Sequence, residues 1–91
     1  MKPAAISGYS LEFRPSALKA LRHIVPRDRV RISNAIQSLA GDPYPPGCKK
    51  LSGEDEFWRI RIGSYRVIYT VIRKRLVVTV VKIGHRREVY R

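Results

Sequence analysis

Three arginines close together in the sequence are the residues of this chain best suited to chemistry. Arg59, Arg61 and Arg66 lie in the segment 57–69, which reads as two strands joined by a Gly63-Ser64 turn. A two-residue turn at this point sets Arg61 opposite Arg66, and strand alternation puts Arg59 on the same face. Like charges directly opposite one another destabilise a sheet. The pattern therefore predicts an anion site, and the planar guanidinium group suits phosphate.

The charge of the whole chain points to the same class of ligand. Its 91 residues include 19 Lys and Arg but only 7 Asp and Glu, which gives a net charge of +12. From Trp58 onward, Glu88 is the one acidic residue among ten basic ones. A charge this one-sided predicts a polyanionic partner, with nucleic acid ahead of an acidic protein or an anionic membrane.

Several other classes of protein fit the sequence poorly. No apolar run approaches the roughly 20 residues of a membrane span, and the first six residues are too short for a signal peptide. Cys48 is the only cysteine, so no internal disulfide can form and a cytoplasmic location fits best. We interpret it as a loop thiol. The two His, Cys48 and the acidic run 54–56 lack metal-ligand spacing, so we expect neither a metal nor a cofactor.

The hydrophobic pattern predicts one α+β domain over residues 9–91 after a flexible lead-in, residues 1–8. Residues 9–13 alternate as a strand does. Helical spacing runs from Pro15 to Val25, and a second helix starts near Pro26 or Arg27 and ends by Gly41. After a loop to about Asp55, we expect three strands, at residues 57–62, 65–72 and 76–83.

The order β-α-α-β-β-β predicts two helices packed on one face of a mainly antiparallel sheet. The last strand is apolar on both faces, so it should be an interior strand. Trp58, Tyr65 and Tyr69 fall on the face that the helices should cover. We therefore interpret these aromatic residues as core packing rather than as base-stacking groups.

Several segments, in this order and at these spacings, resemble the RelE/ParE superfamily of bacterial toxins, and within it the RelE-like mRNA endoribonucleases. The resemblance covers residues 9–90, nearly the whole chain. It implies a toxin that a cognate antitoxin, encoded beside it, neutralises by covering the basic face. The segments that carry the resemblance are Phe13 with Ala17-Leu18 and Leu21, then 50–53 (KLSG), 58–61 (WRIR), 65–69 (YRVIY) and 83–90 (IGHRREVY).

The resemblance also implies a reaction. RelE-like toxins cleave mRNA without a metal, often on the ribosome, by attack of a 2′-hydroxyl on the adjacent phosphate, and so they inhibit translation and arrest growth. The site residues that the family pattern implies here are Arg59, Arg61, Arg66, Arg86 and Tyr90. Lys49, Lys50 and Arg87 are predicted to hold flanking RNA, although a solvated role is the alternative for the two lysines.

The general base is the least determined part of this site. RelE carries lysines where this chain has Arg59 and Arg61, and arginine does not readily release its proton. His85 is the candidate in their place, because nearby cations favour neutral imidazole, which can accept a proton. Glu88 is another candidate, and Tyr90 is predicted either to position the RNA or to pack.

Other functions are also consistent with the superfamily resemblance or with the high positive charge. One is a ParE-like toxin that inhibits DNA gyrase and cuts nothing. The other is a non-catalytic protein that binds RNA or the ribosome, and a toxin with decayed activity is a further possibility. The arginine face and the tail from Gly84 to Tyr90 favour the ribonuclease, because a pure gyrase binder does not need them.

Overall fold

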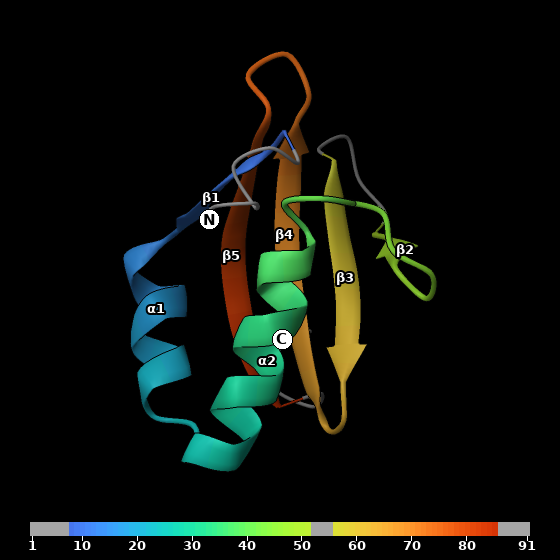
Figure 1. Cartoon of the computed structure of the whole chain (residues 1–91). Coiled ribbons are helices and arrows are strands. Elements are labelled where there is room, and N and C mark those ends of the chain that lie inside the picture. The colour runs from blue at the N-terminus through green and yellow to red at the C-terminus, as the bar shows by residue number, and fades with distance from the viewer. Residues whose placement is uncertain (1–7, 52–55, 86–91) are drawn as a thin grey trace.

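The computed structural model describes residues 8–51 and 56–85, which form two helices against one face of a five-stranded sheet (Figure 1). The sheet order is β1-β5-β4-β3-β2, in which β1 runs parallel to β5 and the other pairs are antiparallel. This arrangement confirms the predicted α+β class. The elements are β1 (Ser10–Phe13), α1 (Pro15–Arg22), α2 (Pro26–Ser38), β2 (Lys49–Lys50), β3 (Phe57–Ile62), β4 (Tyr65–Ile72) and β5 (Val77–His85).

Both helices begin with a proline, which has no N–H to leave unbonded in the first turn. The first helix is shorter than predicted, because α1 ends at Arg22 rather than near Val25. Val25 has an extended backbone, with φ −56° and ψ 146°. Proline disfavours the helical conformation in the residue before it, so Pro26 both starts α2 and separates it from α1.

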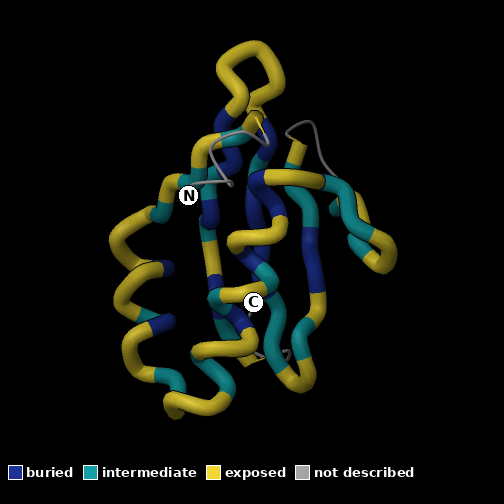
Figure 2. Tube along the Cα trace, viewed as in Figure 1, coloured by how far each residue is buried: buried dark blue, intermediate teal, exposed yellow. Residues whose placement is uncertain are grey.

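The core lies between the helices and the sheet, where Figure 2 shows buried segments along the central strands. Trp58 and Tyr65 pack against this core, and Tyr69 is fully buried within it. The core interpretation of these three aromatic residues is therefore confirmed. The buried core residues are Ala17, Leu21, Ile32, Ile36, Leu39, Ile60, Val67, Tyr69, Val71, Val78, Val80 and Ile83.

The last strand is interior, as predicted, because β5 pairs with β1 on one side and β4 on the other. Its bounds differ from the predicted 76–83. Leu76 lies in the preceding turn with a φ of +55°, and the strand continues to His85. The short strand β2 was also missed, since Lys49 and Lys50 were assigned to a loop and two polar residues carry no strand signal.

A bulge interrupts the pairing of β4 with β5. Ile68 pairs with Lys82 and the next residue, Tyr69, pairs with Val80, so Val81 is an extra residue in β5. The bulge lets Val80 and Ile83 both face the core, three residues apart. It also moves Lys82 and Gly84 to the sheet face away from the helices.

Candidate functional site

The predicted hairpin register is confirmed, because Arg61 pairs with Arg66 and Ile62 pairs with Tyr65 across the Gly63-Ser64 turn. Gly63 has a φ of +59°, as expected at the first central position of such a turn. Directly paired residues point to the same side of a sheet. Arg61 and Arg66 therefore share the face opposite the helices, and alternation adds Arg59 to them.

Two rows of residues cross this face. One row contains Lys49, Arg59, Ile68 and Lys82, from β2 to β5. The other contains Arg61, Arg66 and Gly84. Because glycine has no side chain, β5 places no group beside Arg66 in its row. We call Lys49, Arg59, Arg61, Arg66 and Lys82 the basic face.

The three arginines differ in burial. Arg61 is exposed and Arg66 is half-buried, whereas Arg59 is only 5% exposed. Within residues 8–51 and 56–85, the buried Nε of Arg59 has no hydrogen-bond partner. A buried N–H group without a hydrogen-bond partner lowers stability, and an anion beside it would offset that cost.

His85 lies on the other side of the sheet. It pairs with Tyr65, and the two rings meet edge to face with centroids 5.4 Å apart and planes at 66°. Tyr65 faces the helices, so His85 does too, next to the end of α1. The structure thus brings Arg59, Arg61 and Arg66 together with Lys49, but it separates His85 from them by the thickness of the sheet.

A family model described as the ParE toxin of the type II toxin–antitoxin system parDE matches residues 11–90. The chain belongs to this toxin family. The toxin is 30% identical over 86 residues to a candidate toxin, RelE1, of Methanocaldococcus jannaschii, covering 91% of this chain and 96% of the relative. These matches confirm membership of the RelE/ParE superfamily.

Solved structures agree with this assignment. The isolated Escherichia coli RelE toxin superposes with a TM-score of 0.76 at 30% identity, covering 90% of each chain. The toxin also resembles a chain of the archaeal RelE-RelB complex from Pyrococcus horikoshii, with a TM-score of 0.76 and 26% identity over 89% of this chain and 98% of that one.

The remaining predicted site residues of the toxin fall into two groups. Lys50 pairs with Trp58 and so shares the helix side of the sheet, away from Lys49. The predicted residues Arg86, Arg87, Glu88 and Tyr90 lie outside the described residues. Lys82 and Gly84 were not among the predicted site residues. Lys82 interrupts the apolar run of the last strand, and this was the feature of the sequence that could have indicated a polar residue on the face of the arginines.

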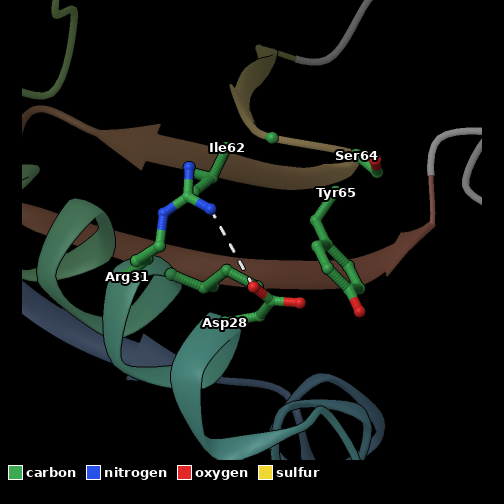
Figure 3. Close-up of a pocket in the computed structure, with 7 residues that line it drawn as sticks. Asp28, Arg31, Ile62, Ser64 and Tyr65 are labelled. Atoms are coloured by element: carbon green, nitrogen blue, oxygen red, sulfur yellow. Dashed lines mark ion pairs between the residues drawn. The ribbon is translucent and has the colours of Figure 1, made fainter.

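A small hollow near the hairpin turn of the toxin does not suit RNA. Figure 3 shows Arg31 of α2 reaching over this turn, with its Nη1 3.9 Å from the Oδ1 of Asp28. The hollow measures about 150 Å³. Ligand pockets are usually at least about 300 Å³, so we do not assign it to a nucleotide.

The described residues of the toxin contain neither a metal-binding cluster nor a membrane-spanning helix. Among them, no three His, Cys, Asp or Glu side chains gather where they could hold a metal ion. None of the described helices is long and apolar enough to cross a membrane.

Proposed function

We propose that this toxin is a metal-independent endoribonuclease that cleaves mRNA in the cytoplasm, on the ribosome, and so inhibits translation and arrests growth. The observation that carries the proposal is the cross-strand pair Arg61 and Arg66 on the basic face. Two guanidinium groups on neighbouring strands can both donate hydrogen bonds to one phosphate. The family assignment supports a toxin, and the basic face supports RNA as its target.

In the proposed reaction, the RNA 2′-oxygen loses its proton and attacks the adjacent phosphorus. The bond from phosphorus to the 5′-oxygen breaks, and this oxygen takes a proton from solvent water, which leaves a 2′,3′-cyclic phosphate and a 5′-hydroxyl. Arg61 and Arg66 donate hydrogen bonds to the phosphoryl oxygens as negative charge builds on them. Arg59 and Lys49 hold neighbouring phosphates, and the missing side chain at Gly84 leaves room beside Arg66.

The proton acceptor is His85 in this proposal, although its ring lies on the helix side of the sheet. The RNA must then pass around the end of β5, where Gly84 permits a close approach. Arg86 and Tyr90 contribute to holding the phosphate, and Arg87 and Lys50 bind flanking RNA. Glu88 is the alternative base.

We also propose that an antitoxin protein covers the basic face. Solved relatives of this chain include RelE-RelB and RelBE toxin–antitoxin complexes. A basic surface of five cations favours an acidic segment in the partner. Such a segment would occupy the same positions as RNA phosphates and exclude the substrate.

The arginine pair is tested by mapping RNA 5′ ends after brief induction of the toxin without antitoxin. Arg61→Ala and Arg66→Ala should each lower cleavage about 10²–10³-fold, because each removes a donor to the developing charge. The matched control is Lys74→Ala with Arg75→Ala, two exposed cations in the turn at the far end of β4. Full toxicity of the double variant Arg61→Ala, Arg66→Ala would refute the mechanism.

The base is tested separately with His85→Ala. If His85 accepts the proton, the variant should lose about 10²–10⁴-fold in cleavage rate while binding RNA with unchanged affinity. Cleavage at the wild-type rate would assign the proton transfer to another group. Fragments phased with the reading frame would support action on the ribosome.

A ParE-like gyrase inhibitor is the second candidate, because the family model that matches the chain is the one described for ParE. The same induction experiment separates the two. Broken chromosomes with intact messages would favour gyrase, whereas cut messages with intact chromosomes favour the ribonuclease. A non-catalytic RNA-binding protein would give neither outcome, only salt-sensitive RNA affinity.

A further inference from the structure

A row of four side chains crosses the sheet beside the basic face and contains no cation. Phe57 pairs with Thr70, Thr70 with Thr79, and Thr79 with Glu12, so the row runs from β3 across β4 and β5 to β1. We call these four residues the outer row. On β3 it lies two residues from Arg59, which is about 7 Å along the strand.

The outer row points away from the helices at both of its ends. Among the described residues, Trp58 packs against the core and Phe57 does not belong to it. Leu11 and Phe13 likewise pack against the core, so alternation turns Glu12, which lies between them, to the opposite side. The outer row therefore shares the sheet face of the arginines.

The polar groups of the outer row are available to a ligand. Thr70 and Thr79 are half-buried and Glu12 is exposed. Within residues 8–51 and 56–85, Glu12 makes no ion pair, and the two threonine hydroxyls make no hydrogen bond. An ionised carboxylate only accepts hydrogen bonds, whereas a hydroxyl both donates and accepts.

We propose that the outer row binds one RNA base and selects a base with an exocyclic amino group. The inference rests on the proposed function, because it takes the phosphate of the same nucleotide to lie at Arg59. Phe57 stacks on the base, as aromatic side chains on open sheets do with single-stranded RNA. The row spans three strand spacings, about 14 Å, so a base on Phe57 and Thr70 extends its far edge towards Glu12.

Glu12 supplies the selectivity. Its carboxylate accepts a hydrogen bond from an amino group, such as the N4 amino group of cytosine. Uracil has a carbonyl oxygen at the equivalent position, and two acceptors facing one another repel. Glu12 is therefore a specificity-determining residue for the nucleotide next to the cleaved bond.

The probes are two pentanucleotides, oligocytidine and oligouridine, with 2′-O-methyl riboses that cannot be cleaved. Both are pyrimidines of the same size and charge, so they isolate the amino group from stacking and from phosphate contacts. In fluorescence anisotropy at fixed salt, the full-length toxin should bind oligocytidine at least about fivefold more tightly than oligouridine.

Glu12→Gln tests the carboxylate, because an amide can donate to uracil as well as accept from cytosine. The ratio of the two affinities should fall to within about twofold. The matched control is Glu56→Gln, since Glu56 lies with Tyr44 and Trp58 on the helix side of the sheet. It makes the same charge change and should leave the ratio at its wild-type value.

Phe57 is tested with a pair of substitutions. Phe57→Leu keeps an apolar side chain but removes the stacking ring, and it should weaken the binding of oligocytidine at least about fivefold. Phe57→Tyr restores the ring and should bind within about twofold of wild type. Backbone NMR of the oligocytidine complex should show shifts of the amide signals of Thr70 and Thr79.

Three outcomes would overturn the proposal. They are equal affinity for the two oligonucleotides, an unchanged ratio in Glu12→Gln, and NMR shifts confined to the basic face. Cleavage of mRNA after induction is measured in parallel. Selection between the bases without cleavage would refute only the ribonuclease, whereas cleavage without selection by Glu12 would refute only the outer row.

Discussion

At the scale of single residues, the face away from the helices combines exposed and buried cations. Arg61 is accessible to a ligand, whereas Arg59 is buried with its Nε lacking a hydrogen-bond partner among the described residues. A protein evolved for stability alone gains nothing from that burial. The anion that we propose as the ligand of this face would offset the cost of that burial.

Tyr69 shows the opposite pattern, a buried polar group with its partner in place. Its hydroxyl donates a hydrogen bond to the carbonyl oxygen of Pro43 at 2.7 Å, and burial raises its pKa above the ordinary value. Tyr69→Phe would leave that carbonyl unbonded. We expect the free energy of unfolding at pH 8 to fall by about 1–3 kcal/mol in urea titrations.

The raised pKa of Tyr69 makes this difference depend on pH. The unfolded phenol ionises above about pH 10 while the folded one stays neutral, so the stability that Tyr69 contributes is complete below pH 10 and declines above it. Between pH 10 and 11 the difference in the free energy of unfolding between wild type and Tyr69→Phe should shrink by about 1 kcal/mol. If this difference in the free energy of unfolding did not change with pH, the raised pKa of Tyr69 would not be its cause.

At the scale of elements, the turn between β4 and β5 contains a strained residue. Leu76 has a φ of +55° and is 47% exposed. A leucine in this conformation costs about 1–2 kcal/mol, and asparagine tolerates it better. Leu76→Asn should therefore raise the free energy of unfolding by about 0.5–1 kcal/mol, measured by urea titration.

The control for this prediction is Ile72→Asn at the end of β4. Ile72 is 40% exposed, but its φ is not positive. The same exchange of an apolar for a polar residue should therefore leave the stability unchanged or lower it. If both substitutions raised the free energy of unfolding equally, relief of backbone strain at Leu76 would not explain the increase.

At the scale of the whole molecule, the net charge is +12, and the basic face holds five of the 19 Lys and Arg residues. With the five cations of the basic face in contact with phosphates, a plot of log affinity for single-stranded RNA against log salt should have a slope of about −3.5. Fluorescence anisotropy with a short RNA measures this slope. Lys49→Gln should reduce its magnitude by about 0.7.

The control for the salt experiment is Lys74→Gln, which removes one charge from the turn between β4 and β5. It should lower affinity slightly through the overall field but leave the slope unchanged. Equal slopes for all three proteins would mean that net charge, rather than the basic face, governs RNA binding.

Much of the candidate site follows from local sequence. The Gly63-Ser64 turn determines the register of Arg61 with Arg66, because hairpin pairing is set by the turn. Proline at the start of each helix and the spacing of Ile32 and Ile36 likewise determine α2 and its buried side.

Only the tertiary structure decided which way the end of β5 faces. Its apolar run has no alternation to orient it, and the extra residue Val81 reverses the faces of every residue after it. Lys82 and Gly84 therefore join the arginines while His85 turns towards α1. Sequence determined the hairpin because its contacts are local, whereas β5 takes its orientation from the core that β1, β4 and the helices build around it.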